Sequence, residues 1–184
     1  MKKIILASSS PRRKELLELH KIDFIIDFQT IDEVLDENLA LPLCLEKLAY
    51  QKALPISSKY PKDIVIGADT MVCLNKQMLG KPKNRQEAFN MLNMLSNHTQ
   101  TVYSAVAIID NGKVATFCDD TKVTFKKLTE QEINDYLDTD EWQGKAGAYA
   151  IQGIGKCLVA KVEGDIETVI GLPVKIIEKY LNFY

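Results

Sequence analysis

The densest group of possible ligand-binding side chains lies at residues 8–14, which hold three serines, one proline and three cations in succession. The segment follows an apolar run at residues 4–6 and precedes a helical pattern, so hydroxyls, backbone N–H groups and a helix N-terminus meet there. Arg12 and Arg13 place positive charge where the helix dipole opposes it, and such a cluster usually answers a negatively charged partner. The segment therefore predicts a phosphate-binding turn. The alternative is an ordinary serine-capped helix with solvated arginines.

Lys52 is a cation on a face that should be buried. It lies seven positions after Leu45 and four after Leu48, on the apolar stripe of a helix predicted over residues 41–58. A lysine there either snorkels to the surface or reaches a cleft where a phosphate sits.

Asp69 follows the apolar strand residues 64–66 after two small residues. A buried aspartate must be hydrogen-bonded, paired or bound to a metal; the alternative is a structural aspartate that caps a turn through Thr70. Glu33 lies in an acidic loop that on its own reads as solvated surface. If the fold brings Glu33 near Asp69, the two carboxylates can bind a hard cation that bridges triphosphate oxygens and activates water.

Two loops add further groups. Lys81 stands between a glycine and a proline, and a glycine-rich stretch at residues 145–155 combines small residues, an aromatic ring and an amide. Gln152 can donate and accept hydrogen bonds at the edge of a base. Residues 153–155 are only a fragment of a dinucleotide fingerprint. The set suits a magnesium–nucleotide complex, and without a nucleophile–base pair, direct attack by water is the simpler chemistry.

Composition limits the class of protein. The 184 residues carry a net charge of −2 and are 46% hydrophobic, which argues against a nucleic-acid binder and favours a substantial core. The four cysteines stand far apart without a CxxC pair, as in reduced intracellular proteins. No apolar run approaches the roughly 20 residues that span a membrane, and the apolar N-terminal run is too short for a signal peptide. We expect a cytoplasmic protein.

The elements that must position these groups alternate between strands and helices. Residues 111–112 are a hairpin signal, residues 75–77 resemble a hairpin tip, and Thr129 with Glu132 forms a capping box. This order predicts an α/β fold with a mixed sheet. The predicted strands cover residues 2–7, 24–28, 63–74, 99–109, 113–126 and 157–163, and the helices 11–20, 41–58, 85–96, 130–138 and 173–182.

Five segments together resemble the motifs of the Maf family of nucleotide pyrophosphatases. They are residues 6–13, 67–70, 80–82, 146–153 and 171–173. The resemblance covers nearly the whole chain in the family's order. It implies one domain over residues 1–184: an elongated, twisted mixed sheet flanked by helices, similar to the inosine triphosphate pyrophosphatases, with a cleft between two lobes. One departure is Asn97, where we expect glycine; asparagine tolerates the left-handed conformation, so the turn can survive.

The resemblance also implies an activity: hydrolysis of a nucleoside triphosphate to the monophosphate and pyrophosphate, with Mg²⁺ or Mn²⁺, as a house-cleaning enzyme and a homodimer. One branch of the family prefers dTTP and UTP, another 7-methyl-GTP. Arg12, Thr70 and Gln152 fit the dTTP/UTP branch, because a glutamine pairs with both a carbonyl and the N3–H of a pyrimidine. Modified pyrimidine triphosphates present nearly the same edge. The alternatives are a 7-methyl-GTP pyrophosphatase and a nucleotide-binding regulator of cell division.

The resemblance assigns roles by position. Asp69 resembles the proton acceptor and a metal-associated acid, and Glu33 resembles its acidic partner and second metal ligand. Lys52 and Lys81 complete the catalytic set. The substrate-binding set is Ser8, Arg12, Arg13, Thr70 and Gln152.

Overall fold

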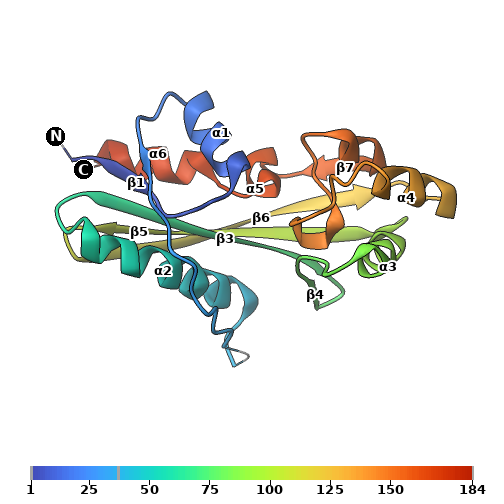
Figure 1. Cartoon of the computed structure of the whole chain (residues 1–184), viewed down its shortest axis with the longest axis horizontal. Helices are drawn as coiled ribbons and strands as arrows, with labels where there is room; N and C mark the ends of the chain where they lie inside the picture. The colour runs from blue at the N-terminus through green and yellow to red at the C-terminus, as the bar shows by residue number, and fades with distance from the viewer. Residues whose placement is uncertain (1, 37, 184) are drawn as a thin grey trace. The chain divides into compact units, whose positions relative to one another are not determined.

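The computed structural model describes residues 2–36 and 38–183. Its strands are β1 (Ile4–Leu6), β2 (Ile25–Ile26), β3 (Ile64–Leu74), β4 (Gln77–Leu79), β5 (Thr99–Asp110), β6 (Lys113–Phe125) and β7 (Val159–Glu163). They form one sheet in the order β2-β1-β3-β5-β6-β7, with β4 paired to β3 (Figure 1). β1 runs parallel to β2 and β3, whereas β3–β4 and β6–β7 are antiparallel pairs. The predicted mixed sheet is confirmed.

The helices flank this sheet. They are α1 (Pro11–Leu19), α2 (Leu41–Lys59), α3 (Arg85–Leu95), α4 (Glu130–Leu137), α5 (Ile166–Ile170) and α6 (Val174–Phe183), with short 3₁₀ turns η1 (Ala146–Ala148) and η2 (Ile154–Leu158). The capping box of Thr129 and Glu132 is present. The hairpin between β5 and β6 turns through Asn111 and Gly112, both with positive φ, as its Asn-Gly signal predicts. Asn97 adopts a φ of 59°, so it does replace glycine in the left-handed region.

Besides the 3₁₀ turns, one strand and one helix are absent from the sequence prediction. The expected tip at residues 75–77 is a turn of Asn75 and Lys76 only, and Gln77 already begins β4. Helix α5 was also missed. Both are too short to show a hydrophobic period.

The chain divides into two compact units. Unit 1 comprises the described residues within 1–70, 104–119 and 171–184, and unit 2 comprises residues 71–103 and 120–170. Strands β3, β5 and β6 contribute residues to both. Throughout the described ranges, no helix is long and apolar enough to cross a membrane.

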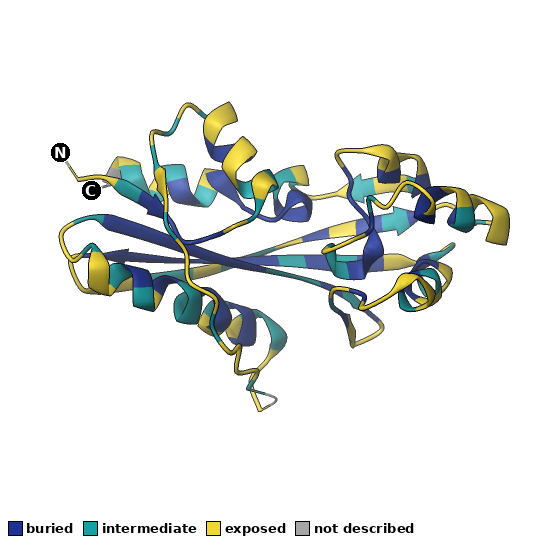
Figure 2. Ribbon diagram, viewed as in Figure 1, coloured by how far each residue is buried: buried dark blue, intermediate teal, exposed yellow. Residues whose placement is uncertain are grey.

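In unit 1, helix α2 packs unusually close to β3. A Cβ atom on Gly67 would lie 2.2 Å from Ala49 O and 2.9 Å from Ala53 Cβ, so only glycine leaves room for the helix. Ile56 and Val65 extend this contact within a buried apolar cluster, and Figure 2 shows β3 buried along most of its length. The close packing sets the height of Lys52 above the strand.

In unit 2, α3 and α4 bury one face each. The side chains on these faces are Ala88, Met91, Leu92 and Leu95 in α3, and Ile133, Tyr136 and Leu137 in α4. The ring of Phe125 meets that of Tyr149 edge-to-face with a centroid distance of 4.8 Å. This contact anchors the glycine-rich loop to β6.

Candidate active site

The turn that follows β1 lies beside β3. Ala7 N donates a hydrogen bond to Ile66 O at 2.8 Å. Ser10 precedes α1 with an extended backbone, and its side chain makes no capping hydrogen bond. Ser8 Oγ accepts hydrogen bonds from Ser10 N at 3.2 Å and from Arg13 Nη1 at 3.1 Å. The alternative of an ordinary serine-capped helix with solvated arginines is therefore wrong.

Arg13 ties three segments of unit 1 together. Its Nε donates to Gly171 O at 2.9 Å, and its Nη1 donates to Ala68 O at 2.9 Å as well as to Ser8. Its Nη2 donates to Thr70 Oγ1 at 3.2 Å. A guanidinium has five N–H donors in a rigid fork, so most of this side chain's capacity is used inside the protein.

Thr70 and Gly171 belong to the same network. Thr70 Oγ1 also lies 2.9 Å from Ser104 Oγ. Gly171 has a φ of +124°, and a Cβ atom there would lie 3.2 Å from Thr70 Oγ1. Ser8, Arg13 and Thr70 are thus brought together by contacts with one another; their contact with a nucleotide stays a prediction.

The side chain of Arg13 is partly buried in this network. Burial lowers the pKa of Arg13, and the neighbouring charge of Arg12 acts in the same direction, whereas the carboxylates of Asp69 and Glu33 oppose the shift. Arginine remains protonated in proteins. The turn therefore keeps a fixed cation close to Asp69.

Lys52 joins the two predicted acids. Its Nζ donates to Oδ1 of Asp69 and lies 3.0 Å from Oε1 of Glu33. The side chains of Lys52 and Asp69 are 19% and 11% exposed, and that of Glu33 is 49% exposed. Lys52 therefore does not snorkel to bulk water. The fold brings Glu33 to Asp69, as the metal hypothesis requires.

Asp69 lies within β3, not after it. The strand predicted over residues 63–74 is present as β3, which runs through Asp69 and Thr70 to Leu74. Its parallel neighbour β1 ends at Leu6, in register with Ile66. Asp69 therefore lies three residues beyond the end of β1, beside the turn that follows that strand. A ligand bound in this turn would lie at the carboxyl end of β1, where ligands bind in α/β sheets. Because β3 continues through Thr70, no turn lies here for Asp69 to cap, and its side chain accepts a hydrogen bond from Lys52.

Glu33 and Asp69 offer oxygen atoms of the kind that bind a divalent metal. Two carboxylates converge on one ammonium group, and across residues 2–36 and 38–183 no group of three or more histidine, cysteine or acidic side chains is placed to hold a metal. Mg²⁺ is commonly bound by one or two carboxylates together with substrate phosphates and water. Glu33 and Asp69 match that pattern and do not form an all-protein cage.

In unit 2, the loops of Lys81 and Gln152 are tied to each other. Gly147 N donates to Gly80 O at 3.1 Å. Gly147 has a φ of +68°, and a Cβ atom there would lie 2.9 Å from Cγ2 of Val72, so this approach requires glycine. Lys81 and Gln152 both have exposed side chains.

Two side chains from outside the glycine-rich loop hold its backbone by hydrogen bonds. Ala150 N donates to the hydroxyl of Tyr136 at 3.2 Å. Glu141 accepts hydrogen bonds from Ile154 N at 2.9 Å and from Gly155 N at 2.8 Å. These two N–H groups are therefore satisfied by a carboxylate of the chain itself.

Comparison with known proteins decides the family. Residues 3–183 match the family model described as Maf-like protein. The chain belongs to the Maf family.

Relatives within the Maf family are similar along nearly their whole length. A Bacillus velezensis protein named dTTP/UTP pyrophosphatase is 48% identical over 173 residues, 94% of this chain and 92% of the relative. Proteins of the same name from Bacillus cereus and a Geobacillus species are each 47% identical; they cover 95% and 94% of this chain, and the matches span 91% and 93% of those relatives. The resemblance drawn from the motifs is confirmed.

The predicted site residues divide between the two units. Ser8, Arg12, Arg13, Glu33, Lys52, Asp69 and Thr70 lie in unit 1, and Lys81 and Gln152 lie in unit 2. Sequence reasoning missed Glu141 and Tyr136, which hold the glycine-rich loop. Neither residue carries a local signal, because each acts on backbone groups 13 or 14 positions away.

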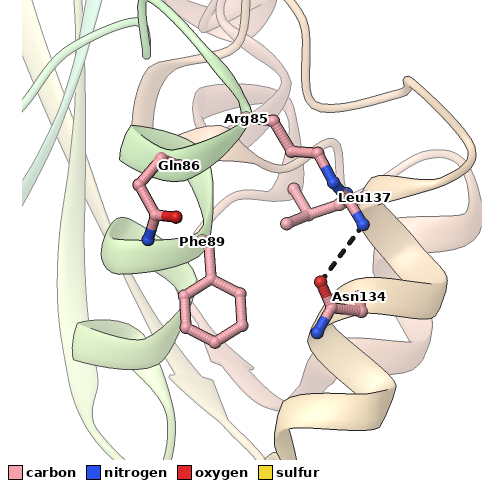
Figure 3. A pocket seen from close by; sticks show the side chains of 5 residues that line it. All are labelled: Arg85, Gln86, Phe89, Asn134 and Leu137. Carbon is pink, nitrogen blue, oxygen red and sulfur yellow. Dashed lines mark hydrogen bonds between the residues drawn. The ribbon is translucent and has the colours of Figure 1, made fainter.

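Unit 2 also holds a hollow of about 430 Å³ between α3 and α4, lined by Arg85, Gln86, Phe89, Asn134 and Leu137 (Figure 3). Arg85 Nη2 donates to Asn134 Oδ1 at 3.1 Å and to Asp138 Oδ1 at 2.7 Å. No predicted site residue lines this hollow. It is a feature apart from the Maf motifs.

Proposed function

We propose that this Maf-family chain hydrolyses dTTP and UTP to the nucleoside monophosphate and pyrophosphate. The observation that carries the proposal is the full-length similarity, at 47–48% identity, to relatives named dTTP/UTP pyrophosphatase. The proposed substrates include modified pyrimidine triphosphates that present the same pairing edge. By hydrolysing them, the enzyme would remove unwanted nucleotides from the cellular pool, which is a house-cleaning role.

In the proposed mechanism, Asp69 orients water for attack on the α-phosphorus. Lys52 holds Oδ1 of Asp69, so Oδ2 is the oxygen left to accept a proton from water. The bond between water oxygen and the α-phosphorus forms, the bond to the bridging oxygen breaks, and pyrophosphate leaves. General-base assistance of this kind contributes typically 10²–10⁴-fold to a rate.

The cations supply electrostatic stabilisation. Lys52, Arg12 and Lys81 offset the charge that develops on the phosphate oxygens, and Arg13 holds the turn that carries Arg12. Glu33 and Asp69 would hold Mg²⁺ or Mn²⁺, and the bound metal neutralises phosphate charge and lowers the pKa of water.

Base selection belongs to Gln152. Its amide oxygen accepts from the N3–H of uracil or thymine, and its amide nitrogen donates to the O4 or O2 carbonyl. We place the enzyme in the cytoplasm, where its free cysteines remain reduced. Its partner is a small-molecule nucleotide and not a nucleic acid, and a homodimer is its expected assembly.

The test is a panel of dTTP, UTP, CTP, GTP and 7-methyl-GTP with Mg²⁺, in which pyrophosphate and orthophosphate are both measured. We expect pyrophosphate from dTTP and UTP. The variant Gln152→Glu should lower kcat/KM for both by about tenfold or more, because a carboxylate faces a pyrimidine carbonyl. Pyrophosphate chiefly from 7-methyl-GTP would overturn the assigned specificity, and no product from any nucleotide would favour a binding protein.

A further inference from the structure

Glu141 places a carboxylate directly under the turn that follows Gln152. Its Oε1 accepts from Ile154 N at 2.9 Å and its Oε2 accepts from Gly155 N at 2.8 Å. The contact is bidentate and charge-assisted, which makes it stronger and more directional than an ordinary hydrogen bond. Glu141 lies in the segment after α4, so the contact joins two stretches that are remote in sequence.

Gly153 makes this contact possible. A Cβ atom at position 153 would lie 1.7 Å from Oε1 and 2.7 Å from Cδ of Glu141. The φ of Gly153 is −103°, so the requirement for glycine comes from space and not from a left-handed backbone. The carboxylate occupies the volume that any other side chain at this position would need, immediately next to Gln152.

Tyr136 fixes the other side of the same loop. Its hydroxyl accepts from Ala150 N at 3.2 Å. Burial raises the pKa of Tyr136, and the negative charge of Glu141 raises it further, so the phenol stays neutral at physiological pH. The backbone is therefore held two residues before Gln152 by Tyr136 and two residues after it by Glu141. The exposed side chain of Gln152 projects from a segment fixed at both ends.

We propose that Glu141 is a positioning residue for base selection: it fixes the backbone on which Gln152 reads the pyrimidine edge. This inference rests on the proposed function and adds the residue that gives Gln152 its precision. Glu141 contacts backbone N–H groups of the chain and acts on the substrate only through Gln152.

The experiment measures kcat and KM for UTP, CTP and 7-methyl-GTP in the wild type and in Glu141→Ala. Misplacing a substrate-contacting group by about 1 Å can cost roughly 10²-fold, so we expect the preference for UTP over the other two to fall by about tenfold or more. The loss should appear in KM for UTP, with kcat changed by about twofold at most, since Asp69 and Lys52 are untouched.

A double-mutant cycle separates positioning from general destabilisation. In a Gln152→Ala background, Glu141→Ala should cause no further loss of preference, because the group it positions is gone. Gly153→Ala keeps the carboxylate but displaces it, and should reproduce the loss of preference. Asp138→Asn is the matched control: this acid lies nearby, is exposed and pairs with Arg85, so preference should not change.

Circular dichroism and thermal unfolding establish whether each variant folds. If Glu141→Ala does not fold, the same measurements are made on Gly153→Ala and Glu141→Gln. The inference is overturned if the folded variants lose activity equally on all three nucleotides or keep the wild-type preference. If the wild-type enzyme releases no pyrophosphate from UTP, the proposed function and this inference both fail. If the wild type prefers UTP and the variants keep the same preference, only this inference fails.

Discussion

Lys52 Nζ in α2 donates a hydrogen bond to Oδ1 of Asp69 in β3. The pair exists because Gly67, two residues before Asp69, lets the helix backbone approach the strand at a distance that no side chain would allow. A cation on an apolar stripe is thereby matched to an acid in a buried strand. The same ammonium group reaches Glu33, so both carboxylates predicted to hold a metal are gathered by one side chain.

Substituting Gly67 by alanine should push α2 away from β3. The new methyl group would meet Ala49 O at 2.2 Å, and overpacking of this kind costs about 1–3 kcal/mol. Urea unfolding measures the loss, and the rate of dTTP hydrolysis should fall as Lys52 moves from Asp69. Gly80→Ala is the control, since a Cβ atom at Gly80 meets nothing within 4 Å; equal stability losses in the two variants would contradict this explanation.

Replacing Asp69 by asparagine should remove the proton acceptor while keeping the size of the side chain. We expect kcat to fall by about 10²–10⁴-fold, with an unchanged circular dichroism spectrum. Asp36→Asn serves as the comparison, because Asp36 pairs with Lys47 on the exposed surface and should leave kcat unaltered. Full turnover in Asp69→Asn would remove Asp69 from the mechanism.

Arg13→Lys should destabilise the protein although it keeps the charge. A lysine cannot reproduce the fork that reaches Gly171 O, Ala68 O and Thr70 Oγ1 together. Leaving a buried carbonyl unsatisfied costs about 1–3 kcal/mol, which chemical denaturation would detect. Arg85→Lys, at an exposed ion pair, should change stability by about 1 kcal/mol or less. A stable Arg13→Lys variant would show that the network does not hold the turn.

The strong local patterns predicted most of the fold. The stripe of α2, the capping box at Thr129 and the Asn111–Gly112 hairpin each depend on neighbours in sequence, and each is present. β4 and α5, with three and five residues, are too short to carry a period. Gly67 interrupts the apolar run of this strand in the sequence, and in the structure its missing side chain leaves room for α2 to pack against β3.

The site was predicted less completely than the fold. Lys52 and Asp69 were found because a charge on an apolar pattern is visible in sequence. The sequence does not show that Lys52 pairs with both acids or that the N–H groups of Arg13 bind within the protein. These contacts join residues up to 158 positions apart. Glu141 has no local signal, since its partners are backbone N–H groups that every sequence contains.

Stability should depend on pH through Glu132. The hydrogen bonds from Thr129 N and Oγ1 lower the pKa of Glu132 below its usual 4.5. A carboxylate with a lowered pKa stabilises the folded state above about pH 4.5 and loses that effect as the pH falls through its folded value. Glu132→Gln should therefore lower the unfolding temperature at pH 7 more than at pH 3. An equal reduction at both values would show that the charge of Glu132 contributes nothing to the cap of α4.

The most direct measurement of the proposed reaction is single-turnover hydrolysis of dTTP in H₂¹⁸O with Mg²⁺, followed by mass spectrometry of both products. Attack of water on the α-phosphorus predicts one ¹⁸O atom in dTMP and none in pyrophosphate. Label in pyrophosphate would place the attack on the β-phosphorus, and labelled orthophosphate would place it on the γ-phosphorus; either result would contradict the chemistry assigned to Asp69 and Lys52.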